Sequence, residues 1–216
     1  SYMYIGPQGI VHGTTITILN AARKYLDISG NEDLAGVLFV TSGLGGMSGA
    51  QPKAAVICGA VCLIAETNLN AARKRLDQGW LSELYDEVDL VIPRVRKALK
   101  SKEAVSIGYH GNIVDLLSAL EKEDLTPHLG SDQTSLHNPW LGGYIPTGYS
   151  HDEAVELLRT SPDKFKFEVQ RTLREHADLI RKLTEKGMYF WDYGNAFLLE
   201  SSRAGADVLN SMNNQD

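Results

Sequence analysis

A glycine-rich turn between a buried strand and a helix is the feature that most constrains the fold of this chain. The apolar run at residues 36–41 (GVLFVT) predicts a strand covered on both faces, as in parallel sheets. Residues 41–50 (TSGLGGMSGA) follow, and residues 50–59 then predict a helix that tolerates Pro52 only in its first turn. Strand, tight turn and helix in this order predict a βαβ unit.

The turn carries a dinucleotide-binding pattern. Gly43, Gly45 and Ser48 fit G-x-G-x-x-G/A, with serine in the last place. The glycines permit a tight turn and a close approach to a pyrophosphate, and the small third residue lets helix and sheet pack. Free N–H groups at the helix start would face the phosphates. Flavin and S-adenosylmethionine could use a similar unit, and a glycine turn without a ligand is the remaining alternative.

An acidic residue completes the predicted unit. Residues 61–65 (VCLIA) predict the next buried strand, which ends at Glu66, 20 residues after Gly46. A carboxylate at this place can accept a hydrogen bond from a ribose 2′-OH and would repel a 2′-phosphate. Because the nearest following arginine is Arg73, the sequence favours NAD over NADP. The P-loop pattern G-x-x-x-x-G-K-[ST] does not occur.

The remaining periodicity predicts an α/β fold: a doubly wound, mostly parallel, Rossmann-like sheet flanked by helices, with additional C-terminal helices. Residues 126–149 are interpreted as a long, functional loop. Pro93 should begin or kink its helix, and Ser150 should form a capping box with Glu153. The polar residues 211–216 are expected to fray. Further strands are expected at 2–5, 104–109 and 188–191, and helices at 14–26, 70–78, 88–99, 113–120, over most of 152–185 with a break near 161–162, and after 195.

Two further segments are candidate ligand contacts. Residues 131–139 (SDQTSLHNP) and 142–146 (GGYIP) could line a polar ligand or form a turn-rich surface loop. His137 could be a base, a ligand or a structural donor. Gly111 and Asn112 follow a predicted strand at the edge of the sheet where such folds bind ligands.

Composition excludes several classes of function. The 216 residues suit one domain, and a net charge of -6 provides no basic field for nucleic acid or anionic membranes. No apolar run approaches the roughly 20 residues that span a bilayer.

Several individual side chains are expected to be structural. Cys58 and Cys62 are expected to be reduced core thiols, which fits a cytosolic protein. The histidines lack a zinc-binding pattern, so no metal is expected. Arg73, Lys74 and Arg75 are expected on a solvated helix face, and Phe190 and Trp191 in a core.

Four strings, in order, resemble segments of the urocanase family. They lie at residues 4–14 (YIGPQGIVHGT), 43–52 (GLGGMSGAQP), 132–139 (DQTSLHNP) and 192–195 (DYGN), and the likeness covers nearly the whole chain. The forms at 108–112 and 191–196 are nearer to the animal-type branch. The resemblance implies that residues 1–216 are a single NAD-binding Rossmann-like domain, excised from a larger chain. It implies that the whole protein is a cytosolic homodimer and a lyase of histidine degradation. Such an enzyme adds water to urocanate to give 4-imidazolone-5-propionate, with NAD as an electrophile.

The resemblance also implies the residues that contact the cofactor. The family's cysteine and its G-F-G-P-F-R-W-like segment do not occur, so no catalytic residue is expected here and the isolated chain should be inactive. Ala71 stands where the family has an arginine. A conventional NAD dehydrogenase with His137 as acid or base, and a non-catalytic NAD-binding module, remain alternatives. The implied cofactor contacts are Gly45, Gly46, Met47 and Ser48 at the phosphate-binding turn, Glu66 at the adenosine ribose, Asn112 and Ile113 at the next strand end, and Gln133, Thr134, Ser135, Leu136, His137, Tyr144, Ile145 and Tyr193 along the cofactor.

Overall fold

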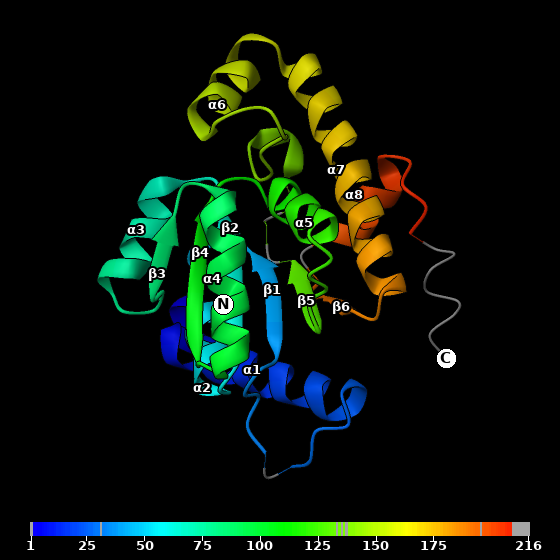
Figure 1. Cartoon of the computed structure of the whole chain (residues 1–216). Helices are drawn as coiled ribbons and strands as arrows, with labels where there is room; N and C mark the ends of the chain where they lie inside the picture. Colours follow the sequence, from blue (N-terminus) through cyan, green and yellow to red (C-terminus); the bar gives the residue numbers. More distant parts are fainter. Residues whose placement is uncertain are drawn as a thin grey trace.

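A parallel six-stranded sheet organises the computed structural model, which describes residues 2–30, 32–132, 134, 136, 138–194 and 196–208. The strand order is β3-β4-β2-β1-β5-β6, and every pair of neighbours is parallel (Figure 1). The predicted doubly wound α/β fold is therefore confirmed. The strands are β1 (Leu38–Ser42), β2 (Val61–Glu66), β3 (Glu83–Tyr85), β4 (Val105–His110), β5 (Leu129–Asp132) and β6 (Tyr189–Asp192).

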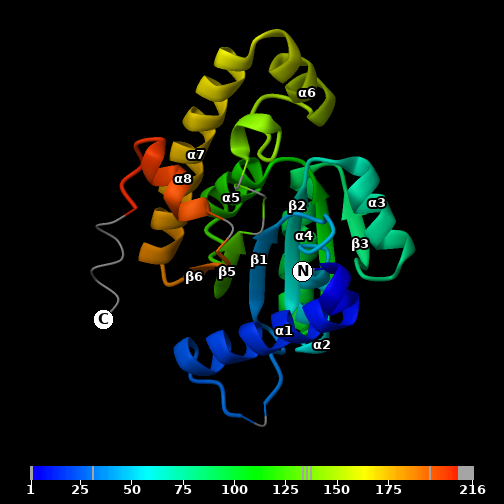
Figure 2. The same ribbon diagram turned by 180° about the vertical axis from the view of Figure 1, so that it is seen from behind.

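Helices cover both faces of the sheet, because successive strand residues point to opposite sides. Leu38 and Val40 pack in a cluster with α4, α5 and α7, whereas Phe39 packs with α1 and α2 on the other face. Figure 2 shows α1 and α2 in front of the strands on this second face. The helices are α1 (Tyr2–Tyr25), α2 (Ala50–Ile57), α3 (Leu69–Asp77), α4 (Val88–Ser101), α5 (Ile113–Lys122), α6 (His151–Thr160), α7 (Pro162–Glu185) and α8 (Phe197–Arg203), with a short 3-10 turn η1 (Pro139–Leu141).

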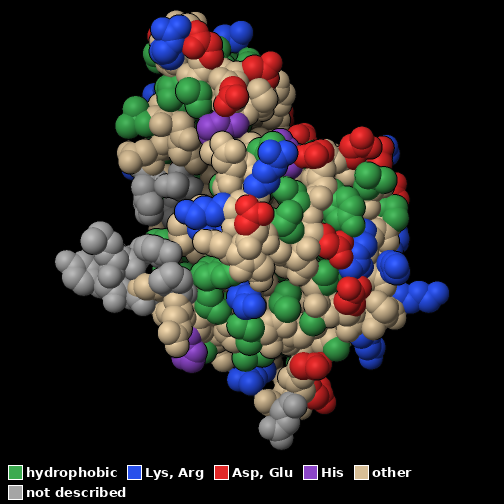
Figure 3. All heavy atoms as spheres, turned by 90° about the vertical axis from the view of Figure 1, so that its left-hand side faces the viewer, with side chains coloured by type: hydrophobic (Ala, Val, Ile, Leu, Met, Phe, Trp, Pro, Cys, Tyr) green, Lys and Arg blue, Asp and Glu red, His purple; other side chains and the backbone are tan. Residues whose placement is uncertain are grey.

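The order of the strands reverses at β1. The chain proceeds from β1 to β2, β3 and β4 on one side, and then crosses to β5 and β6 on the other. Helices leave the sheet in opposite directions at such a switch point, so a crevice opens outside the carboxyl ends of the strands. The strand arrows point toward α6, which lies above this edge (Figure 1). Figure 3 shows that the top of the molecule, which holds α6 and the start of α7 in Figure 1, is joined to the rest by a narrower region with histidine side chains at its surface.

Two sequence predictions are wrong in detail, one strand was missed, and one of two alternatives is excluded. Residues 2–5 are helical rather than a strand, and Gly6, at φ 70°, separates two helical pieces of α1. Residues 126–149 are not one loop, because they contain β5, in which Leu129 pairs with Phe39 of the central strand. The edge strand β3 was not predicted, since three residues are too short to show an alternating pattern. Of the two alternatives for Pro93, the start of a helix is excluded, because Pro93 lies inside α4, which begins at Val88.

Several local predictions are confirmed. Ser150 and Glu153 form the capping box that opens α6, and Pro162 begins α7. Cys58 and Cys62 are free and buried, and burial raises the pKa of the Cys58 thiol to about 11.

Two kinds of feature do not occur among the described residues. None of their helices is both long and apolar enough to cross a membrane. No three of their His, Cys, Asp or Glu side chains gather in a group that could hold a metal ion. Residues 211–216 lie outside the described residues.

Candidate functional site

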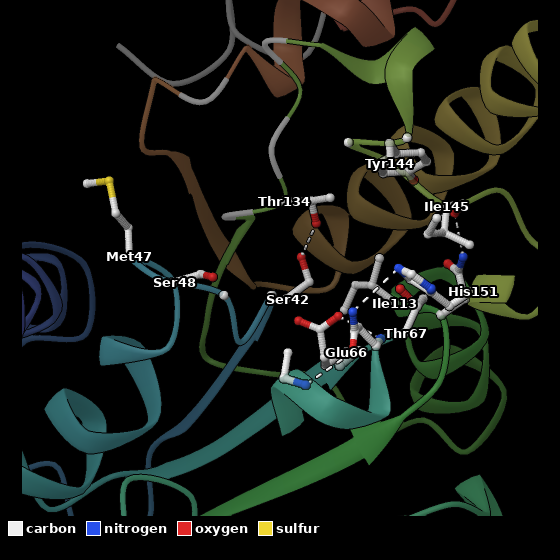
Figure 4. Close-up of a pocket in the computed structure, with 18 of the residues that line it drawn as sticks. Ser42, Met47, Ser48, Glu66, Thr67, Ile113, Thr134, Tyr144, Ile145 and His151 are labelled. Carbon is white, nitrogen blue, oxygen red and sulfur yellow. Dashed lines mark hydrogen bonds between the residues drawn. The ribbon is translucent and has the colours of Figure 1, made fainter. Parts of the chain in front are cut away.

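A cavity of about 620 Å³ lies at the carboxyl edge of the sheet. Ser42, Glu66, Asn112, Thr134 and Tyr193, which end or follow five different strands, all line it. Residues 142–145 and the start of α6 line its opposite side. Figure 4 shows Ser42, Glu66, Thr134, Tyr144 and His151 gathered from separate elements, while Met47 points away from them. The cavity therefore lies where a doubly wound sheet binds its ligand.

Residues of the glycine-rich turn that line this cavity carry unpaired main-chain donors. The N–H of Gly43 donates to Ala65 O at 2.8 Å, and that of Gly49 to Gly45 O at 3.1 Å. By contrast, no described residue accepts a hydrogen bond from the N–H of Gly45, Gly46 or Ser48, all of which line the cavity. Helix α2 starts directly after the turn and has no side-chain cap. Unpaired N–H groups at a helix start form a site for an anion.

Glu66 ends β2 beside this turn. Its Oε2 accepts a hydrogen bond from Leu44 N at 2.6 Å, and its Oε1 accepts one from Asn68 N at 2.8 Å. The side chain also lines the cavity (Figure 4). Since each carboxylate oxygen has a second lone pair, Glu66 can brace the turn and still accept a ligand hydroxyl. Its negative charge suits a ribose diol and opposes a second phosphate.

Asn112 connects the floor of the cavity to its opposite wall. Its Oδ1 accepts a hydrogen bond from Val114 N at 3.0 Å and thereby caps α5. Its Nδ2 donates to Ile145 O at 2.8 Å. The side chain is buried, so both bonds are shielded from water. Asn112 thus fixes the distance between the end of β4 and residues 142–145.

A hydroxyl network supports the cavity at the carboxyl ends of β1 and β5. The Ser42 hydroxyl donates to the buried carboxylate of Asp132 and lies 2.8 Å from the Thr134 hydroxyl. Asp132 also accepts a hydrogen bond from Thr134 N at 3.0 Å. Thr134 and Ser42 line the cavity, whereas Asp132 is fully buried and does not. The network therefore fixes two hydroxyl groups at the cavity wall.

Two tyrosines give the cavity an uncharged wall. The Tyr144 hydroxyl lies 3.0 Å from Nδ1 of His176, and both side chains are buried. Burial raises the pKa of Tyr144 well above its usual value and lowers the pKa of His176 to about 3, so the pair is neutral near pH 7. Burial also raises the pKa of Tyr193. The Tyr193 hydroxyl is itself buried and forms no hydrogen bond in the described structure, so Tyr193 meets the cavity through its other atoms.

Most of the predicted contacts meet at this cavity. Leu136 does not line it, because its side chain is fully buried in the cluster of α4, α5 and α7. Gln133, Ser135 and His137 lie outside the described residues. The predicted residues that line the cavity are Gly45, Gly46, Met47, Ser48, Glu66, Asn112, Ile113, Thr134, Tyr144, Ile145 and Tyr193.

Sequence reasoning missed other residues of the cavity. Asn68 accepts a hydrogen bond from Ala71 N and caps α3, a role that an asparagine before a helix can signal. His151, the first residue of α6, lies across the cavity with Nε2 3.5 Å from Nδ2 of Asn68. No local pattern indicates that contact. Arg75, predicted on a solvated helix face, is buried under the glycine-rich turn, so that prediction is wrong.

Comparison with known proteins agrees with this geometry. Residues 6–214 match the family described as the urocanase Rossmann-like domain. The chain is 58% identical to "Urocanate hydratase" of Homo sapiens and 56% identical to that of Mus musculus, over 213 residues in each case. These alignments cover 96% of this chain and 31% of each relative, so the chain spans about a third of their length. "Probable urocanate hydratase" of Dictyostelium discoideum is 56% identical over 210 residues. The chain therefore belongs to the urocanase family, as its Rossmann-like domain.

Proposed function

We propose that this chain binds NAD and is the cofactor domain of a urocanate hydratase. The observation that carries the proposal is the set of unpaired N–H groups of Gly45, Gly46 and Ser48, which line a cavity together with Glu66. The amides suit a diphosphate, and the carboxylate suits the adenosine ribose. The cavity volume lies within the roughly 300–1,000 Å³ typical of small-molecule sites.

The remainder of the cavity suits the nicotinamide half of the cofactor. Thr134 and Tyr193 follow β5 and β6, which lie across β1 from Glu66. The hydroxyl of Thr134 supplies a neutral polar group there, and the uncharged side chain of Tyr193 adds to the neutral wall. NAD, when bound, supplies an electrophilic ring to the reaction. This chain's own residues hold and orient the cofactor, and the Tyr144 wall keeps water from one side.

The hydration of urocanate is proposed for the whole protein. The named relatives are urocanate hydratases, and this chain corresponds to 31% of their length. The chain contains two cysteines, and burial raises the pKa of each, so neither is a reactive thiolate at neutral pH. We therefore assign no catalytic residue to this chain. A cytosolic homodimer remains a prediction for the complete enzyme.

Two measurements test this proposal. Calorimetric titration of the 216-residue chain should show binding of NAD and weaker binding of NADP, because Glu66 opposes the 2′-phosphate. The full-length protein should deplete the ultraviolet absorbance of urocanate without net formation of NADH, whereas the chain alone should show no turnover. Failure of the chain to bind NAD would refute the cofactor assignment. Steady NADH formation with an oxidised product would indicate a dehydrogenase instead.

A further inference from the structure

A buried arginine lies directly beneath the glycine-rich turn. Arg75, in α3, is 6% exposed. Its Nε donates to Leu44 O at 3.1 Å, and its terminal nitrogens donate to Gly45 O at 2.5 Å and to Oε1 of Gln78 at 2.7 Å. The guanidinium fork thus holds two successive carbonyl groups of the turn.

The direction of these two carbonyls decides where two amides point. The described chain contains no cis peptide bond, and in a planar trans peptide the C=O and the N–H point in opposite directions. Because Leu44 O and Gly45 O face Arg75, the N–H groups of Gly45 and Gly46 face away from it. Both N–H groups are unpaired in the described structure, and both belong to residues that line the cavity.

The neighbouring residues leave the guanidinium little freedom. The Trp80 ring lies 5.4 Å from it, as in a cation–π contact, and Gln78 accepts the third hydrogen bond. A Cβ added at Gly49 would overlap the guanidinium, so only glycine leaves room for it there. Glu66 anchors the preceding peptide unit through Leu44 N. Three consecutive peptide units of the turn are therefore fixed by two charged side chains.

The charge of Arg75 is not matched within the described part of the protein. Its partners are two main-chain carbonyls, an amide oxygen and an aromatic ring, and it forms no ion pair with a carboxylate of the described residues. A buried charge is usually paired. An anion bound on the far side of the turn would supply the missing opposite charge, and the intervening peptide dipoles would point from the guanidinium toward it.

We propose that Arg75 is a positioning residue for the diphosphate of the cofactor. It aims the N–H groups of Gly45 and Gly46 into the cavity and adds a positive charge behind them. This inference rests on the proposed function, because it presumes that the turn binds a dinucleotide. Arg75 itself does not line the cavity, so it acts through the main chain.

The test compares ligands with and without a diphosphate. Dissociation constants for NAD, ADP-ribose and adenosine are measured by calorimetry on the 216-residue chain and on Arg75→Met, which keeps the apolar stem. We expect NAD and ADP-ribose to bind about tenfold more weakly to the variant, since two charge-assisted contacts lose their alignment. Adenosine affinity should change less than about twofold. Arg73→Met, exposed on the same helix, is the matched control and should leave all three affinities unchanged.

A conservative variant keeps the inference testable if Arg75→Met does not fold. Arg75→Lys retains the charge, but its single ammonium cannot fork to both carbonyls, so its NAD affinity should fall between those of the wild type and Arg75→Met. Thermal unfolding of each variant monitors the fold. An unchanged NAD affinity in Arg75→Met, or equal losses for NAD and adenosine, would overturn the inference.

A second readout separates this inference from the proposed function. In ligand-free chain, the amide resonances of Gly45 and Gly46 should shift in Arg75→Met and Arg75→Lys but not in Arg73→Met. A wild-type chain that fails to bind NAD would refute the proposed function and the diphosphate assignment together. Unshifted amides in the Arg75 variants would refute the positioning role, even if the wild type binds NAD.

Discussion

Replacing Glu66 is the most informative test of the ribose assignment. The carboxylate accepts hydrogen bonds from Leu44 N and Asn68 N and retains a free lone pair on each oxygen. Glu66→Ala removes the ligand contact and also leaves these two N–H groups without their acceptor. Glu66→Gln keeps one acceptor oxygen but places an NH₂ donor against one of the two N–H groups. We therefore expect glutamine to rescue little of the lost affinity.

The magnitude follows from the number and charge of the bonds. A hydrogen bond to a charged acceptor contributes about 1.5–3 kcal/mol, so NAD should bind roughly 10- to 150-fold more weakly to Glu66→Ala. The two protein bonds at 2.6 and 2.8 Å are partly exposed to solvent. Their loss should lower the free energy of unfolding by about 1–3 kcal/mol in total. Binding and stability should therefore fall together.

The assay separates the ribose contact from the bracing of the turn. Calorimetry compares NAD with its analogue lacking the adenosine 2′-OH, on wild type and on Glu66→Ala. The wild type should lose affinity when the 2′-OH is removed, and the variant should not. Glu32→Ala, exposed before β1 at the opposite edge of the sheet, is the control. An unchanged NAD affinity in Glu66→Ala, or the same 2′-OH effect in both proteins, would refute the ribose assignment.

Two further predictions concern stability. Asn112→Ala removes the cap of α5 and the hydrogen bond to Ile145 O, so urea unfolding should show a free energy of unfolding lower by about 1–3 kcal/mol. The control, Asn70→Ala, changes an exposed side chain and should lower it by less than about 0.5 kcal/mol. Equal effects of the two substitutions would contradict the role assigned to Asn112. Burial lowers the pKa of His176 from 6.5 to about 3, so below pH 6.5 the unfolded chain binds a proton that the native chain does not. The contribution of neutral, buried His176 to stability is therefore fully present above pH 6.5 and is lost as the pH falls from 6.5 to 3. When the pH is lowered from 7.0 to 5.5, the free energy of unfolding of the wild type should fall by about 1 kcal/mol more than that of His176→Asn. If stability depends on pH identically in both proteins, protonation of His176 does not contribute.

The local signals of the sequence were sufficient for the central part of the fold. Apolar runs indicated β1, β2 and β4, and the glycine pattern indicated the turn before α2, because strand burial and turn geometry depend on neighbouring residues. The short strands β3 and β5 were not predicted, because their own residues carry too weak a pattern. Residues 129–132 (LGSD) contain one large apolar side chain, and only pairing with β1 on one side and β6 on the other makes them a strand.

The sequence alone determined the kind of site, and the tertiary structure decided which distant residues complete it. The order of strand, glycine turn, helix, strand and Glu66 is continuous in the chain, so it could be recognised without coordinates. His151 and Arg75 depend instead on where α6 and α3 pack. Arg73 and Arg75 are the same residue type on the same helix, but helical geometry directs Arg73 toward solvent and Arg75 beneath the glycine-rich turn. That difference arises from packing between elements, which no local pattern encodes.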